Sequence, residues 1–319
     1  MMAVALILEK DGVRSIWVGC DIIAAYDVLT DEVETLLLEQ LPGFEPNQLA
    51  IAGTHIHTGP YIKRDGLLSL TGDKGQKEDA GTLTTKACRH QIAEGICRAI
   101  MLAHHSLEES VLGLSVANII TGVNRRVVYR DGSAKMYGQL NTDQFSHMES
   151  RDGGPSQFIY VHRLSDGALT GVVCNVPCTA QCDEMANYIS ADYWGVVREH
   201  VGSALGKDVH ILPLCRAAGD LSPHPMVDQL AGFDHNRWGR QLALDLGNWI
   251  AENIISHQKR ILRRYDADTV LKQYGTKLTL PLWTVTAQEY RDACEYLTNP
   301  DNYEADKKPK DLFGFANAW

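Results

Sequence analysis

Short apolar runs alternate with longer amphipathic segments, and this pattern most constrains what the chain can fold into. Runs of strand length occur at 3–8, 13–20, 49–52, 111–117, 127–137, 157–162, 169–176, 209–214 and 277–283. Apolar residues at helical spacing occur at 31–41, 78–104, 190–205, 234–260 and 287–297. Hairpin turns connect some strands, at Asp11-Gly12 and at Asp131-Gly132, where 127–137 folds back as a hairpin, and helical crossovers connect others. The sequence therefore predicts an α/β fold of mixed β-sheets with flanking helices.

Length and charge limit the classes of protein to consider. With 319 residues and 45% hydrophobic content, the chain can bury a large core, which suits one large globular domain or two closely packed ones. A net charge of −10 argues against broad nucleic-acid binding, which needs a basic face. No stretch approaches the ~18 apolar residues of a membrane helix, and no secretion signal is visible, so we expect a cytoplasmic protein. The oligomeric state is not predicted.

Two histidines directly follow the apolar run at 49–52, in the stretch Gly53–Pro60 (GTHIHTGP). If the strand continues through them, the period of two places His55 and His57 on one face. Gly59-Pro60 would then end the strand. Two adjacent imidazoles at the end of a buried strand provide two of the ligands that a metal site needs. The alternative is a pair of histidines satisfied by backbone hydrogen bonds near a loop.

Polar clusters also follow three other predicted strands. Asp21 follows the strand at 13–20, a cluster at 175–181 lies at the end of the strand at 169–176, and a cluster at 220–224 follows the strand at 209–214. Because α/β folds build sites in the loops at strand ends, we expect these clusters to meet the histidines in one cleft. A buried carboxylate needs a partner or a metal, which makes Asp21 a candidate, although a turn or N-cap acid is the alternative.

Three of these four clusters resemble the neutral/alkaline ceramidase family. Gly53–Pro60 is similar to the family's GTHTHSGP signature, and Ala218–Pro223 is similar to GDVSPN, with His224 in place of the asparagine. Asp21 resembles the family's strand-terminal aspartate, and Asn124-Arg125 its NR-containing turn. The resemblance covers roughly residues 4–260. It implies the fold of the ceramidase catalytic domain and a zinc-dependent hydrolase that cleaves the amide bond of N-acylated sphingoid lipids.

The resemblance also implies roles for individual residues. His55 would be a zinc ligand, and His57 a neighbouring imidazole that orients groups or moves a proton. Zinc would lower the pKa of its bound water towards ~7 and polarise the amide carbonyl. Ser222 would contact that carbonyl, and Asp220 would hold the loop of Ser222.

The rest of the predicted metal site departs from the family pattern. Near the position of the family's second zinc histidine this chain has Cys178, so we predict zinc ligation by its thiolate together with His55 and Asp21. The alternatives are an inert cysteine, or a site rebuilt around His224 or around Asp183/Glu184.

The chain also lacks parts that the family has. We find no match for the family's later glutamate and tyrosine ligands, for its opening segment or for its C-terminal immunoglobulin-like domain. We therefore expect a truncated chain, a divergent subfamily or both. The resemblance implies that residues 1–319 form a single α/β catalytic-type domain that is incomplete at both ends relative to the family.

These observations leave three alternative functions for the chain. The first is a zinc-dependent hydrolase of a small-molecule or lipid amide. The second is an inactive or repurposed ceramidase-like protein that binds a small molecule or lipid. The third is a hydrolase that uses Cys178 as its nucleophile with a histidine.

Overall fold

The computed structural model describes residues 1–60, 62, 83–151, 153–227, 238–265, 268–276, 278–279, 281 and 284–302. Two compact units divide the chain: Met1–Asp65 with Glu78–Gly275, and Gly66–Lys77 with Thr276–Trp319. The described part of the second unit contains helix α6 (Ala287–Thr298), capped by Thr286 and Glu289, and a short 3-10 turn at Pro300–Asn302. The strand predicted at 277–283 lies largely outside the described residues.

The first sheet of the large unit is built from β1 (Ala3–Lys10), β2 (Val13–Cys20) and β3 (Leu49–Gly53). The strands β1 and β2 form the predicted hairpin, whose turn residues Asp11 and Gly12 both have positive φ. In contrast, β2 and β3 are parallel, so Cys20 and Gly53 lie side by side at their carboxyl ends. Helices α1 (Asp27–Gln40) and α3 (Thr85–His105) bury their apolar faces against this sheet.

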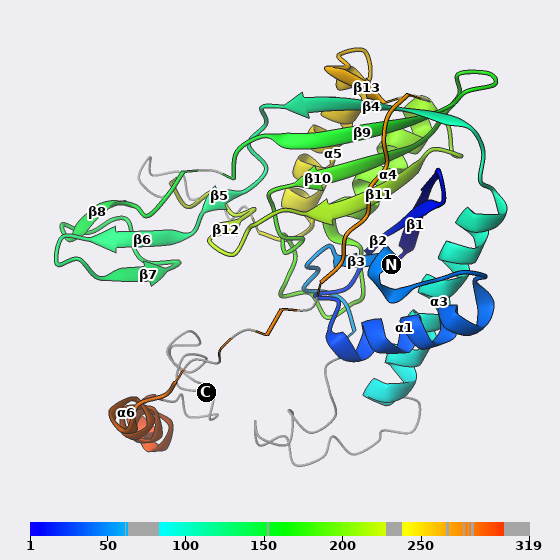
Figure 1. Cartoon of the computed structure of the whole chain (residues 1–319). Helices are drawn as coiled ribbons and strands as arrows, with labels where there is room; N and C mark the ends of the chain where they lie inside the picture. Colours follow the sequence, from blue (N-terminus) through cyan, green and yellow to red (C-terminus); the bar gives the residue numbers. More distant parts are fainter. Residues whose placement is uncertain are drawn as a thin grey trace. The chain divides into compact units, whose positions relative to one another are not determined.

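The second sheet has the order β11-β10-β9-β4-β13. Its strands are β4 (Ser110–Ala117), β9 (Ser156–Arg163), β10 (Leu169–Val176), β11 (His210–Cys215) and β13 (Arg263–Tyr265). Only β10 and β11 pair in parallel; the other neighbours are antiparallel. Helices α4 (Asp192–Leu205) and α5 (Arg240–His257) lie beside this sheet (Figure 1). Their apolar side chains pack with those of the strands into one core.

The two sheets touch where β2 approaches β11. A Cβ atom at Gly19 would lie 2.3 Å from the carbonyl oxygen of Pro213, so only glycine permits this approach. The contact lies near the carboxyl ends of both strands. The segments that follow β3, β10 and β11 therefore begin in the same region of the molecule.

Two small sheets extend from this region. Strand β12 (Leu221–Ser222) pairs with β5 (Val123–Asn124). The other sheet has the order β7-β6-β8, formed by β6 (Arg126–Tyr129), β7 (Ala134–Met136) and β8 (Phe145–Met148). The predicted hairpin at 127–137 is thus present, whereas β8 lies in a segment without a predicted strand. The pairing of β12 with β5 brings Ser222 close to this hairpin.

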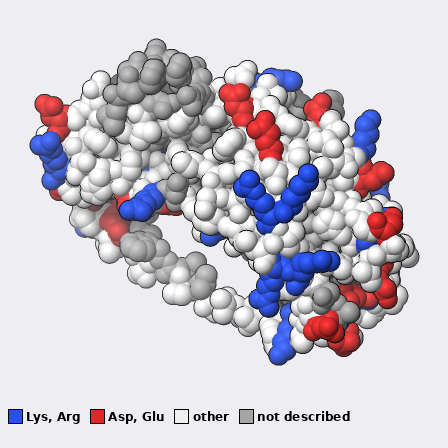
Figure 2. Space-filling model, turned by 90° about the horizontal axis from the view of Figure 1, so that it is seen from above, with Lys and Arg blue, Asp and Glu red and all other residues white. Residues whose placement is uncertain are grey.

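The predicted α/β class with mixed sheets and flanking helices is confirmed. No helix in the described residues is long and apolar enough to cross a membrane. On the face shown in Figure 2, acidic and basic side chains are interspersed among uncharged ones.

Candidate functional site

The two histidines lie in a turn, because β3 ends at Gly53. The strand does not continue through them, so the period of two does not describe how His55 and His57 lie. His55 has a φ of 58°, a left-handed conformation that histidine adopts more readily than most residues. Backbone hydrogen bonds from Thr54 to Cys20 (2.9 Å) and from Ile56 to Ile22 (3.4 Å) hold the turn on both sides. The turn still brings the imidazoles together, with 5.2 Å between the ring centroids of His55 and His57.

The loop after β10 is bonded to this turn. The backbone N–H of His57 donates to the carbonyl of Ala180 (3.2 Å), and the N–H of Ala180 donates to the carbonyl of Thr54 (3.3 Å). As a result Glu184 meets the imidazole, with 3.0 Å between its Oε2 and Nδ1 of His57. The other ring nitrogen of His57, Nε2, is buried and has no hydrogen-bond partner among the described residues.

Ser222 lies at the centre of a second group of polar side chains. Its Oγ accepts a hydrogen bond from the hydroxyl of Tyr137 (3.0 Å) and lies 2.7 Å from Nδ1 of His224. The indole of Trp238 stacks on His224, with 3.3 Å between ring centroids. Ser222 and His224 are both buried.

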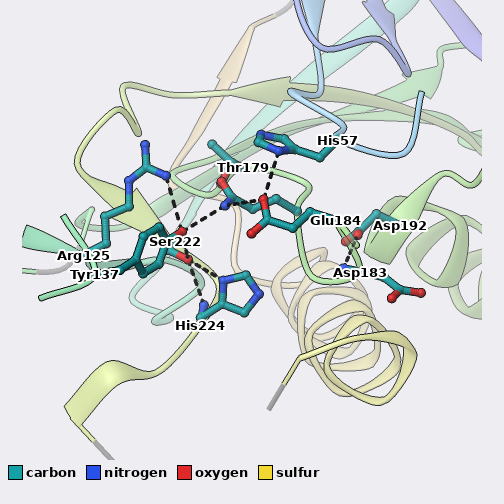
Figure 3. A network of polar contacts seen from close by, with 10 residues as sticks. His57, Arg125, Tyr137, Thr179, Asp183, Glu184, Asp192, Ser222 and His224 are labelled. Atoms are coloured by element: carbon teal, nitrogen blue, oxygen red, sulfur yellow. Dashed lines mark hydrogen bonds and ion pairs between the residues drawn. The ribbon is translucent and has the colours of Figure 1, made fainter. Parts of the chain in front are cut away.

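Gln181 joins the two groups. Its Nε2 lies 3.0 Å from the hydroxyl of Tyr137 and 3.2 Å from Oε2 of Glu184. Its Oε1 accepts a hydrogen bond from the hydroxyl of Thr179 (2.5 Å). One continuous network of polar contacts therefore runs from His57 to His224 (Figure 3).

Asp220 holds the loop that carries Ser222. Its Oδ2 accepts hydrogen bonds from Asn124 (2.9 Å) and Ser150 (2.8 Å), and its carbonyl accepts one from the backbone of Arg125 (2.9 Å). The guanidinium of Arg125 donates to the carbonyl of Gly219 (2.8 Å). The resemblance implies a loop-holding role for Asp220, and the residues of the NR turn are among its hydrogen-bond partners.

Burial lowers the pKa of two histidines at the site. Burial and the charge of neighbouring His57 lower the pKa of His55, whereas a hydrogen bond to the carbonyl of Ile23 raises it and offsets part of this effect. Burial also lowers the pKa of His224, to about 4. The charge of Glu184 and a hydrogen bond to the carbonyl of Cys182 raise this pKa and offset part of the effect of burial. Both rings are therefore neutral near pH 7. A neutral imidazole has one nitrogen that can accept a proton or bind a metal.

Two of the predicted metal ligands have other partners. The carboxylate of Asp21 is bound by Arg198 on α4 at 2.7 and 2.9 Å and by the backbone N–H of Met2 at 2.8 Å. The buried carboxylate of Asp21 therefore has a partner, which is the guanidinium of Arg198 and not a metal ligand set. Cys178 is buried, its Sγ contacts the carbonyl of Thr179 at 3.4 Å, and burial raises its pKa well above the ordinary thiol value. A protonated thiol is a poor nucleophile, which argues against the use of Cys178 as a nucleophile.

The residues at the site fit zinc only in part. His55 bonds a backbone carbonyl, the kind of partner that orients a zinc histidine, and His57 is oriented by Glu184 in a similar way. In the described part of the chain, however, no group of three or more His, Cys, Asp or Glu side chains is arranged to hold a metal ion. The donor set is incomplete there, and we derive no chemical step through zinc.

Comparison with known proteins identifies the architecture. No protein-family model matches the chain, and no curated protein matches its sequence. Among solved structures, a ceramidase complexed with C2 matches with a TM-score of 0.62 and 18% identity over 82% of this chain. The neutral ceramidase from Pseudomonas aeruginosa matches with a TM-score of 0.59 and 17% identity over 80% of this chain. This chain has a ceramidase fold.

The predicted resemblance is thus confirmed at the level of the fold. The ceramidase fold of this chain spans 38% of the length of each of those two structures. Both motifs that carried the resemblance lie at the site described above.

Sequence reasoning missed Tyr137 and Gln181 as site residues. Gln181 belongs to the polar cluster after β10, which gave a signal for the loop without singling out this residue. Tyr137 directly follows β7, and nothing in its local sequence indicates a site. Glu184 and His224 were alternatives to Cys178, and the structure places both in the network.

Proposed function

We propose that the chain hydrolyses the amide bond of an acylated amine at the site around His57 and Ser222. One observation carries this proposal: the histidine motif and the serine motif, far apart in the sequence, are joined by a single hydrogen-bonded network through Glu184, Gln181 and Tyr137. The likeness in fold to two ceramidase structures supports the same reaction class.

His57 is the proton carrier in this proposal. Glu184 accepts the hydrogen of Nδ1, which orients the ring and increases the basicity of Nε2. The buried, unpartnered Nε2 takes a proton from the attacking water and returns it to the leaving amine. The hydroxyl of Ser222 lies at the other end of the network, where we place the substrate carbonyl.

An apolar substrate is supported by the surface beside Glu184. Met185, Tyr188 and Ile189 follow Glu184 in the chain and are 83%, 50% and 65% exposed. A group of exposed large side chains beside a site is a candidate binding surface. We propose that the acyl part of the substrate lies on these residues. The substrate class is then a lipid amide or another amide with an apolar acyl group.

A panel of N-acyl amides with short and long acyl chains, each releasing a fluorescent amine, tests the reaction. We expect hydrolysis by the wild-type protein and a loss of about 10²- to 10⁴-fold in kcat for His57→Gln, which removes the proton carrier. His147→Gln, on exposed β8, is the matched control and should keep wild-type activity. Undiminished activity of His57→Gln would contradict the proposed role.

Zinc dependence is a separate part of the proposal. When bound at His55, zinc would supply an activated water and polarise the carbonyl. Elemental analysis of the purified protein should find one zinc ion per chain, and His55→Ala should lose it. A wild-type protein that hydrolyses amides without bound metal would refute the zinc dependence and leave the role of His57 standing.

The second function, a binding protein without catalysis, is favoured by the incomplete donor set. It predicts that the acyl amides bind without turnover. Calorimetric titration of the wild-type protein, with product analysis of the same mixture, distinguishes the two functions.

A further inference from the structure

Each hydrogen bond between His57 and His224 has a direction, and that direction follows from the donors and acceptors present. The first fixed point is Glu184, because a carboxylate only accepts. The group of Gln181 that faces it at 3.2 Å must therefore be the NH2, which also fixes the orientation of the amide. For the same reason Nδ1 of His57, at 3.0 Å from Glu184, carries a hydrogen.

The direction continues through Tyr137. The second hydrogen of the Gln181 NH2 group points to the hydroxyl of Tyr137 at 3.0 Å, and Nη1 of Arg125 approaches the same oxygen at 3.4 Å. Both lone pairs of that oxygen then face donors. Among the contacts between described residues, the single hydroxyl hydrogen of Tyr137 goes to Ser222, at 3.0 Å.

Counting donors and acceptors at the hydroxyl of Ser222 in the same way leaves one possible set of hydrogen-bond directions. Its Oγ accepts from Tyr137 and from the backbone N–H of His224 (3.2 Å). With both lone pairs taken, the hydroxyl hydrogen of Ser222 points to the remaining neighbour, Nδ1 of His224 at 2.7 Å. Nδ1 of His224 is then an acceptor, and its ring hydrogen is on Nε2.

We propose that Gln181 is the positioning residue of this site, because its donation to Tyr137 fixes the tautomer of His224, opposite to the tautomer of His57 that Glu184 fixes. Nε2 of His57 is left as an acceptor, as proton transfer requires, and the hydroxyl of Ser222 is held by His224. This arrangement also excludes His224 as a metal ligand through Nδ1, which already accepts from Ser222. The contribution to catalysis rests on the proposed function; the tautomers do not.

Long-range proton–nitrogen NMR correlations of the histidine rings, recorded without substrate at pH 8, test the proposal. In the wild-type protein we expect hydrogen on Nδ1 of His57 and on Nε2 of His224. Finding the ring hydrogen of His224 on Nδ1 would overturn the proposal.

Gln181→Glu provides the decisive variant. The new carboxyl group lies about 3.2 Å from Glu184, so the two share one proton that lies between them. Towards Tyr137 the new oxygen only accepts, so Tyr137 must donate to it, Ser222 then donates to Tyr137, and Nδ1 of His224 donates to Ser222. The tautomer of His224 should invert, while that of His57 stays unchanged because Glu184 still accepts from it. An unchanged His224 would contradict the directional role of Gln181.

Two further variants keep the test decisive. Gln157→Glu makes the same substitution on β9, where Gln157 only accepts a hydrogen bond from Asn175, and should leave both tautomers unchanged. Tyr137→Phe removes the hydroxyl link without a large change in volume, so His224 should show a mixture of tautomers. A single unchanged tautomer of His224 in Tyr137→Phe would equally overturn the proposal.

Activity gives a separate readout. If the chain hydrolyses acyl amides, Gln181→Glu should lower kcat by about 10- to 100-fold, as is common for partners of site residues, with little change in KM. A wild-type protein without amide hydrolysis would refute the proposed reaction but not the tautomers. An inverted tautomer with unchanged kcat would refute the contribution of Gln181 to catalysis.

Discussion

At the scale of single residues, His224 shows how burial determines protonation. Trp238 stacks on its ring, and burial lowers its pKa from 6.5 to about 4. Above pH 6.5 the ring is neutral in both the folded and the unfolded chain. As the pH falls from 6.5 to about 4, the unfolded chain takes up a proton that the folded chain resists, so His224 lowers the free energy of unfolding over this window.

His224→Gln should remove this contribution. The wild-type protein should lose stability between pH 6.5 and 4 more steeply than the variant, with a difference of up to about 3 kcal/mol. Urea unfolding at a series of pH values measures the slope. His210→Gln, at the exposed start of β11, is the control and should follow the wild-type slope. Parallel pH profiles for His224→Gln and wild type would show that the ring titrates normally.

At the scale of elements, two helical glycines have opposite surroundings. A Cβ atom at Gly247 on α5 would lie 2.6 Å from Cβ of Val196 and 2.8 Å from the carbonyl of Tyr193, both on α4. A Cβ atom at Gly95 on α3 would meet nothing within 4 Å. Glycine is therefore required by the packing of α4 on α5, whereas on α3 it only lowers the helix propensity.

The same substitution should have opposite effects at these positions. Gly247→Ala should destabilise the protein by about 1–3 kcal/mol, because overpacking outweighs the gain in helix propensity. Gly95→Ala should stabilise it by up to about 1 kcal/mol. Urea unfolding of both variants measures the two free energies. A stabilised Gly247→Ala would mean that α4 and α5 can move apart at little cost.

At the scale of the whole large unit, one buried ion pair links its two sheets. Asp21 follows β2 of the first sheet, whereas Arg198 lies on α4, which covers the second. The side chain of Asp21 is fully buried, so removing Arg198 leaves a buried carboxylate with no opposite charge and with the backbone N–H of Met2 as its remaining hydrogen-bond donor.

Arg198→Met should therefore lower the free energy of unfolding by about 3–5 kcal/mol. Arg14→Met, which removes the exposed pair with Glu9, should cost no more than about 1 kcal/mol. Chemical denaturation of the two variants compares them directly. Equal, small losses would show that Asp21 finds another partner or is protonated in the folded protein.

Much of the architecture was predictable, because strands and helices have local signals. The hairpin of β1 and β2, the pair β9 and β10, and the helices α3 and α4 follow from apolar periodicity and turn residues. The end of β3 was not predictable in this way. Hydrogen bonds from residues 54 and 56 to residues 20 and 22 hold the left-handed turn at His55, and they are not local.

The sequence by itself determined the fold class, the two motifs of the site and the need of Asp21 for a partner. Tertiary structure decided which partners these residues have. Asp21 pairs with Arg198, Cys178 is buried as a thiol, and Glu184 and Gln181 join His57 to Ser222. The physical reason is that hydrogen bonds and ion pairs extend only about 3 Å, so they depend on which loops the packed sheets bring together.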